Sequence, residues 1–114
     1  AYVKSALVTD GTEYGLLVVH ADRDPDLDRA AQLIGRDVRL ASDDERSARC
    51  PGCQRGAIPP FGSLFGIRTY LDSTLQDEDR VAFLAETCDR TVVMDRSALL
   101  EVEDPDIAEL TATA

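Results

Sequence analysis

The sequence predicts a single domain of the α/β (α+β) class, with a mixed β-sheet and short flanking helices. β-rich runs and helical patterns are interleaved along the 114 residues, and no fixed-period repeat is present. Hydrophobic residues make up 44% of the chain, enough for one core without disulfides or metals. We therefore expect one domain, residues 1–114, built around a single core.

The first half of the chain predicts a hairpin followed by two helices. The runs 3–8 and 15–20 are rich in β-formers and are separated by the turn dipeptide Asp10-Gly11, so they predict paired strands. Asp24 before Pro25 predicts the start of a helix that ends at Gly35. Residues 38–40 predict a short strand.

The second half begins with a predicted helix at 43–49, which Ser42 and Glu45 introduce as a capping box. Residues 50–66 are rich in glycine and proline and predict a loop. Strands are expected at 68–71, 81–84 and 91–94, and a short helix at 96–100. Asp104-Pro105 predicts one more helical turn or two.

Charge and composition exclude several classes of protein. The formal net charge is −10, so the average surface repels phosphate and tight non-specific binding to DNA or RNA is not expected. No apolar run is long enough to span a membrane, and residues 1–11 resemble no secretory leader, so we expect a cytoplasmic protein. Three cysteines, an odd number, agree with a reducing compartment.

Two features are candidates for a functional site. Lys4 is the only lysine among twelve basic residues, and it lies in the first predicted strand. Lysine presents a compact ammonium where arginine presents a rigid fork, so the two are not interchangeable at a site that holds one point. The alternative interpretation is that this single lysine is present by chance and has no special role.

The second feature is a stiff loop, residues 56–62. Its members are Gly56, Ala57, Ile58, Pro59, Pro60, Phe61 and Gly62. Glycines allow a ligand to approach the backbone, while the prolines remove two amide donors and fix φ. The loop therefore predicts binding through main-chain groups. A rigid connector whose apolar side chains fill the core is the other interpretation.

These residues together resemble the YbaK/EbsC family of prolyl-tRNA synthetase-associated editing domains. The shared features are the Lys4 strand, the run from Gly56 to Gly62, and the following Tyr70-Leu71-Asp72. The resemblance runs over nearly the whole chain and implies a YbaK-like sheet or barrel. It also implies a trans-editing aminoacyl-tRNA deacylase that hydrolyses the ester of a misacylated tRNA, with the tRNA 3′ end as its partner.

The resemblance assigns roles to particular residues. Lys4 is implied as the catalytic side chain, the loop 56–62 and Asp72 as the substrate-binding set, and neither a metal nor a cofactor is implied. From its own position, Asp72 is expected to cap the turn before Leu75 and not to act as an acid or base. Which amino acid and tRNA are handled, and the oligomeric state, stay open.

The sequence also departs from the family pattern. Family domains usually carry a helix and a strand ahead of the lysine strand, and because only three residues precede Lys4 here, we expect the domain to lack them. Where related members show Asn-Ala-Gly-x-His, this chain has Leu84, Glu86 and Cys88 at the Asn, Gly and His positions. A catalytically inactive binding or regulatory module is therefore the alternative function, and a fragment of a longer enzyme is a third.

Other candidate sites are weaker. Cys50 and Cys53 have the spacing of a zinc knuckle, which Cys88 and His20 would have to complete, but no second closely spaced pair is present. Ordinary loop thiols are the favoured interpretation. The aspartates at 22–28 lack the glycine and distal glutamate of a calcium loop, and carboxylates favoured by a helix dipole explain them better.

Overall fold

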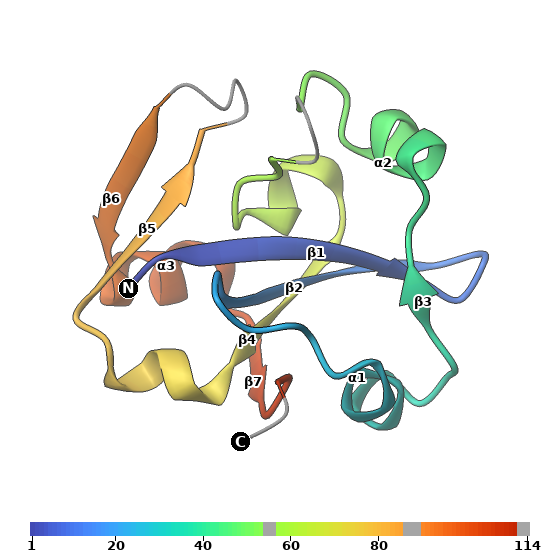
Figure 1. Ribbon diagram of the computed structural model, residues 1–114, viewed down its shortest axis with the longest axis horizontal. Coiled ribbons are helices and arrows are strands. Elements are labelled where there is room, and N and C mark those ends of the chain that lie inside the picture. The colour runs from blue at the N-terminus through green and yellow to red at the C-terminus, as the bar shows by residue number, and fades with distance from the viewer. Residues whose placement is uncertain (54–56, 86–89, 112–114) are drawn as a thin grey trace.

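The computed structural model describes residues 1–53, 57–85 and 90–111 (Figure 1). The strands within these ranges are β1 (Val3–Thr9), β2 (Tyr14–His20), β3 (Arg39–Leu40), β4 (Arg68–Asp72), β5 (Arg80–Leu84), β6 (Thr91–Asp95) and β7 (Asp106–Ala108). The α-helices in this part of the chain are α1 (Leu27–Ile34), α2 (Asp43–Arg49) and α3 (Arg96–Glu103). The 3-10 helices η2 (Gly62–Phe65) and η3 (Ser73–Asp77) flank β4. Among the helices described, none is long and apolar enough to cross a bilayer.

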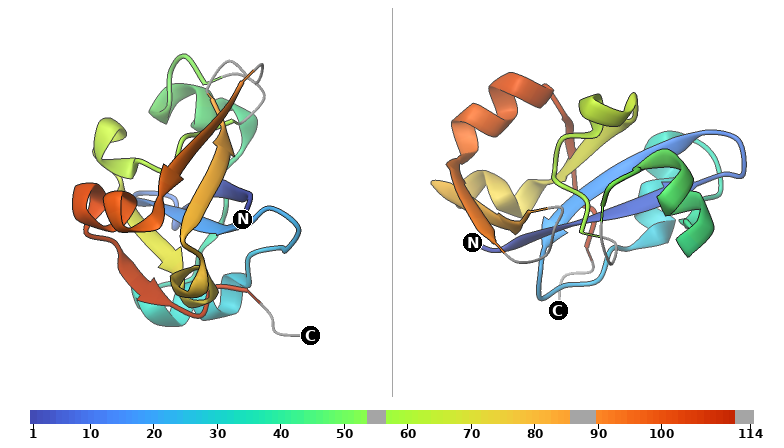
Figure 2. Two further views of the ribbon diagram at one scale, coloured as in Figure 1. Left: turned by 90° about the vertical axis from the view of Figure 1, so that its left-hand side faces the viewer. Right: turned by 90° about the horizontal axis from the view of Figure 1, so that it is seen from above.

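Five strands form one mixed sheet in the order β3-β1-β2-β4-β7. β1 runs antiparallel to both β2 and β3, whereas β4 runs parallel to β2 and β7 runs parallel to β4. β5 and β6 form a separate antiparallel hairpin, and Tyr2 bridges to Ala82 just ahead of β1. Figure 2 shows this hairpin at one end of the molecule with α3 beside it. The mixed α+β architecture predicted from the sequence is confirmed.

Both faces of the sheet are covered. Successive side chains of a strand point to opposite sides, so each face packs against its own set of elements. On the α1 face, Val8, Leu17 and Val19 pack against Ala30 of α1 and against Leu110. On the opposite face, which we call the loop face, the chain between α2 and β4 covers the sheet. Residues of β1 and β2 on this face are Val3, Leu7, Leu16 and Val18. Figure 1 shows α1 on one side of the sheet and α2 with η2 on the other.

Local signals predicted most elements correctly. The Asp10-Gly11 hairpin is present, and Gly11 has a φ of 100° that favours glycine. The capping box of α2 is complete: Ser42 Oγ accepts from the amide of Glu45, and the Glu45 carboxylate accepts from the amide of Ser42. Both motifs are formed by residues only a few positions apart, so the local sequence is sufficient to predict them.

The predicted start of α1 was wrong by two residues. Asp26, not Asp24, caps the helix by accepting from the amides of Asp28 and Arg29. Pro25 is extended because it bridges to Thr111, and the amide of Asp26 donates to the carbonyl of Leu110. Pairing with the C-terminal segment therefore delays the helix.

The predicted final helical turn was also wrong. Asp104 ends α3 in the left-handed conformation with a φ of 44°, and Asp106–Ala108 continue as strand β7. Arg68 of β4 donates two hydrogen bonds to the carboxylate of Asp106, which stabilises the pairing of β4 with β7. A distant partner decides this segment, and its local sequence does not carry that information.

Candidate functional site

Lys4 lies near the start of β1 with its side chain half-buried. Its ammonium lies 3.6 Å from a carboxylate oxygen of Asp24, and the Asp24 side chain is fully exposed. An exposed ion pair of this kind contributes little to stability, because water screens both charges. The ammonium can therefore exchange Asp24 for an anionic ligand at low cost.

The strand register determines the face on which Lys4 lies. Lys4 pairs with Val19, and paired residues of an antiparallel ladder point to the same side. Val19 packs on the α1 face, so the alternation of β1 puts Lys4 on that face as well. Its neighbours Val3 and Leu7 point to the loop face.

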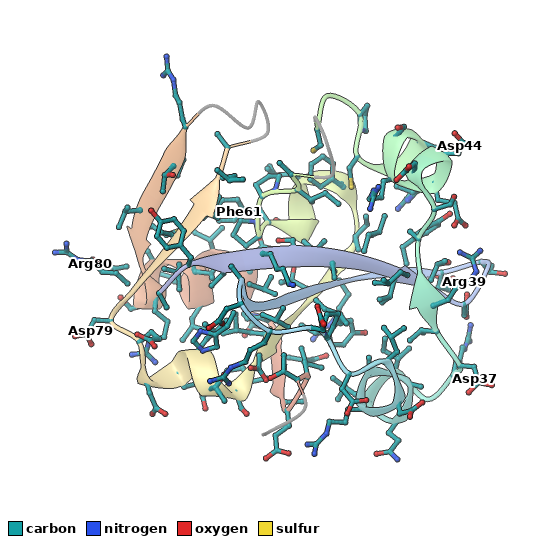
Figure 3. All side chains as sticks on the ribbon, in the orientation of Figure 1. Asp37, Arg39, Asp44, Phe61, Asp79 and Arg80 are labelled. Carbon is teal, nitrogen blue, oxygen red and sulfur yellow. The ribbon has the colours of Figure 1, made fainter. Side chains whose placement is uncertain are left out.

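The loop itself packs on the opposite side. Ile58, Pro59, Pro60 and Gly62 are buried, and Ala57 and Phe61 are half-buried, while Gly56 lies outside the described residues. Ile58 joins Leu7 in one core cluster, and Phe61 packs against the cluster that contains Val3. The Phe61 ring meets the Phe83 ring edge-on at a centroid distance of 5.7 Å. Figure 3 shows Phe61 between η2 and the β5–β6 hairpin.

Two consequences follow from this placement. The apolar side chains of the loop are used by the core, as the rigid-connector interpretation expects, so a ligand is left with the main-chain groups. A common pocket for Lys4 and the loop stays a prediction. Between Tyr2 and Val8 the outer edge of β1 carries no strand among the described residues, and the ammonium would have to reach the loop around this edge.

The C-terminal end of the loop is held by a polar network. The amide of Gly62 donates to Thr69 Oγ1 at 3.0 Å, and that hydroxyl donates to the carboxylate of Glu103 at 2.8 Å. The same carboxylate accepts from the amide and the hydroxyl of Ser63. The network joins η2, β4 and α3, so the backbone at the end of the loop has one fixed position.

Gly62 has no room for a side chain. A Cβ atom built at this position would lie 2.5 Å from Thr69 Oγ1 and closer still to the carbonyl oxygen of Ile67. Its φ is outside the left-handed region, in contrast to Gly66 with a φ of 68°. Gly62 is therefore required for close packing and not for an unusual backbone conformation.

Asp72 is buried at the end of β4. Its carboxylate accepts from the amide of Leu110 at 2.9 Å and from the hydroxyls of Thr111 and Thr74. The expected cap is not formed, because the Asp72 side chain accepts from the Thr74 hydroxyl and from no backbone amide of η3. These contacts attach the C-terminal segment to the sheet, and the assignment of Asp72 to substrate binding stays a prediction.

Ser5 is a candidate that the sequence analysis missed. It follows Lys4 but points to the loop face, between Val3 and Leu7. Its hydroxyl oxygen is buried and has no hydrogen-bond partner among the described residues. Buried polar groups are normally paired, so a hydroxyl without a partner in the described part of the chain, on the face that the loop covers, is a candidate ligand contact. The sequence signal for Ser5 was weak: a hydroxyl residue directly after Lys4 in a strand that is otherwise mostly apolar.

Other chemistry is less favoured by the described residues. No group of three or more His, Cys, Asp or Glu side chains in the described ranges is placed to hold a metal, and Cys88 and Glu86 lie outside those ranges. Burial raises the pKa of the Cys50 thiol to about 11, which disfavours a reactive thiolate.

A cavity of about 260 Å³ opens on the α1 face near the β1–β2 turn. Its lining includes Tyr70, Arg36 and Arg68 but neither Lys4 nor any residue of the loop. Arg36 is paired with Asp10 and Arg68 with Asp106, so both cations are already neutralised. We therefore do not assign an anion-binding role to this cavity.

Comparisons with known proteins place the chain among tRNA-editing domains. Residues 1–102 match the family model of the aminoacyl-tRNA editing domain. The chain is 31% identical over 104 residues to the multifunctional Ser/Thr-tRNA deacylase ProXp-y of Escherichia coli (strain K12), an alignment that covers 90% of this chain and 62% of that protein. The chain thus spans less than two thirds of this relative.

Solved structures share the fold. A crystal structure of a proposed trans-editing enzyme for prolyl-tRNA synthetase superposes with a TM-score of 0.84 and 26% identity, covering 98% of this chain and 71% of that one. A proposed signal transduction protein from Marinobacter aquaeolei VT8 superposes with a TM-score of 0.83. That match covers 98% of this chain and 25% of that one, and at 17% identity it shows the fold alone.

Proposed function

Because the chain belongs to the aminoacyl-tRNA editing domain family, we propose that it hydrolyses the ester of a misacylated tRNA in trans. The observation that carries the proposal is the family match over residues 1–102, which includes Lys4 and the whole loop 56–62. The name of the E. coli relative makes Ser- and Thr-tRNA the first esters to test. We propose a cytoplasmic location, with the tRNA 3′ end as the part that enters the site.

The proposed chemistry relies on positioning. An aminoacyl ester is already activated, so a rigid site that holds it beside water and directs dipoles at the developing oxyanion is sufficient. The loop fits this role because Ile58, Pro59 and Pro60 are buried and the Gly62 amide is fixed by Thr69, which gives a preorganised backbone in the described part of the loop. The reaction needs neither a metal nor a cofactor.

We assign separate roles to the residues of the site. Lys4 pairs with the terminal phosphate or stabilises charge at the ester, displacing Asp24. The backbone of residues 56–62 binds the aminoacyl group, and the Ser5 hydroxyl is available as an additional hydrogen-bonding group beneath the loop. The net charge of −10 is compatible with such a substrate, because recognition of an unpaired RNA end depends on local stacking and hydrogen bonds.

A specific observation favours a second candidate, a non-catalytic binding module. Lys4 lies on the α1 face and is paired with Asp24, whereas the loop packs on the other face. If Lys4 and the loop do not act on the same ester, the domain binds the aminoacylated end without hydrolysing it.

A deacylation time course separates the two candidates. Wild-type protein is incubated with Ser-, Thr-, Ala- and Pro-tRNA, and the esters are followed against a protein-free control. The deacylase proposal predicts accelerated loss of at least one ester. Hydrolysis of every ester at the uncatalysed rate, combined with measurable binding of aminoacylated over uncharged tRNA, would instead support the binding module.

A further inference from the structure

Strand β6 is an exposed edge. It lies at the margin of the molecule in Figure 1, and β5 is its only strand neighbour within the described ranges. Val92 is 39% exposed and Val93 is 59% exposed, so apolar side chains on both faces of the strand contact water. Proteins usually protect such an edge with lysine, proline or a bulge, and residues 91–95 contain neither lysine nor proline.

The hydrogen bonds of the β5–β6 hairpin show which backbone groups of β6 are free. The amide of Ala85 donates to the carbonyl of Arg90, and the amide of Arg96 donates to the carbonyl of Asp79. In an antiparallel pair, alternate residues direct their N–H and C=O groups toward the partner strand. The even-numbered residues of β6 therefore face β5, and Thr91, Val93 and Asp95 direct their backbone groups outward.

This outward set is self-complementary. In a two-fold antiparallel arrangement with Val93 opposite Val93 of a second copy, Thr91 of each strand lies opposite Asp95 of the other. Every outward N–H and C=O group then has a partner, and the Thr91 hydroxyl can donate to the facing Asp95 carboxylate. Asp95 is free to accept, since its ion pair with Arg80 is long, 3.7 Å, and exposed.

The side chains support the same arrangement. Tyr2 bridges to Ala82, and Ala82 pairs with Val93, so these three residues lie in one row across the outer face of the hairpin. Tyr2 is 61% exposed and Val93 59% exposed. A second copy placed about a two-fold axis at Val93 extends this apolar row across both molecules. Figure 3 shows Arg80 extending away from the ribbon at the margin of this face.

We propose that β6 is a self-association surface, through which a second copy of this chain pairs edge to edge to form a continuous four-stranded antiparallel sheet. The symmetry is isologous, because the same strand serves both copies. The interface is small, so a concentration-dependent monomer–dimer equilibrium is expected. This proposal does not depend on deacylase activity.

Sedimentation velocity of the full chain, over about 5 to 500 μM and in enough salt to screen the net charge of −10, tests the proposal. Wild type is expected to shift from monomer to dimer. Val93→Pro removes an outward N–H that has no partner among the described residues of the monomer, a position where an edge strand tolerates proline. Val93→Lys places two like charges on the two-fold axis. Each variant should raise the dissociation constant at least about tenfold.

Val102→Lys is the matched control, because Val102 is a 63% exposed valine on α3, away from β6. This variant should dimerise within about twofold of wild type. Circular dichroism checks folding, and Val93→Lys decides the result if Val93→Pro does not fold. Wild type that stays monomeric over the whole concentration range overturns the proposal. The β6 edge would then be a candidate binding site for an extended segment of another protein. Folded Val93 variants that dimerise like wild type also overturn it.

Discussion

Replacing Gly62 with alanine should destabilise the protein although it adds only one methyl group. The new Cβ would lie 2.5 Å from Thr69 Oγ1, against 3.4–4 Å for an ordinary contact, and the nearby backbone oxygen of Ile67 cannot rotate away. Overpacking of this kind costs about 1 to 3 kcal/mol. Disturbing the hydrogen bond from the Gly62 amide to Thr69 adds about 0.5 to 1.5 kcal/mol. We expect the free energy of unfolding to fall by about 2 to 4 kcal/mol.

Urea denaturation measures this loss directly, and an unchanged m-value would show that the unfolded state is the same. In a domain of this size the corresponding fall in melting temperature is on the order of 8 to 16 °C. Gly66 is the matched control. A Cβ at Gly66 meets nothing within 4 Å, but its φ is 68°. Gly66→Ala should cost about 1 to 2 kcal/mol, and Gly66→Asn should recover part of it, because asparagine tolerates the left-handed conformation.

Asparagine at Gly62 should give no such recovery, since the obstacle there is space and not torsion. A Gly62→Ala variant within about 0.5 kcal/mol of wild type would refute the reasoning, because it would mean that η2 can move away from β4 at little cost.

Three further perturbations test other parts of the structure. Asp72→Asn should lower the free energy of unfolding by about 1 to 3 kcal/mol in urea melts, because the carboxylate holds the C-terminal segment. Deacylation should stay unchanged. Lost activity at wild-type stability would instead place Asp72 in the active site. Glu103→Ala should lower the free energy of unfolding by a similar amount, because it loosens η2. The control is Glu101→Ala, at an exposed position, which should change stability by less than about 0.5 kcal/mol. Equal stability of the two variants would contradict the role of the Glu103 network. Hydrogen bonds from Arg39 hold the pKa of Glu45 at about 2, below its ordinary 4.5, so its contribution to stability is present above pH 4.5 and is lost as pH falls toward 2. Glu45→Gln should therefore make the free energy of unfolding depend less on pH in the acid range. An unchanged dependence would show that the Glu45–Arg39 pair does not contribute to acid destabilisation.

The parts of the fold that could be predicted are those with local causes. The α2 capping box and the Asp10-Gly11 hairpin depend on neighbours within a few residues, and both were predicted from the sequence. Strand β7 could not be predicted in this way. The pairing of Asp106 with Arg68 joins positions 38 residues apart, and the local Asp104-Pro105 signal favours a helix.

The same distinction between local and distant causes applies to the candidate site. The sequence indicates Lys4 and the loop by residue type, and strand periodicity predicts that Lys4 and Ser5 point to opposite faces. Which face the loop covers depends on Ile58 joining the core cluster that contains Leu7, and no pattern near Lys4 encodes this packing. The unpaired Ser5 hydroxyl is visible only once the loop lies above it.

The central claim is that Lys4 acts in ester hydrolysis together with the loop. The most direct test is the deacylation rate of wild type, Lys4→Ala and Lys4→Arg on the ester that wild type hydrolyses fastest, with matched thermal melts. We predict that Lys4→Ala lowers the rate about 10² to 10³-fold, as for loss of a group that stabilises developing charge, at nearly wild-type stability because the side chain is half-buried and weakly paired. Lys4→Arg should also lose most activity if a compact ammonium is required. A Lys4→Ala variant that deacylates as fast as wild type would contradict the claim.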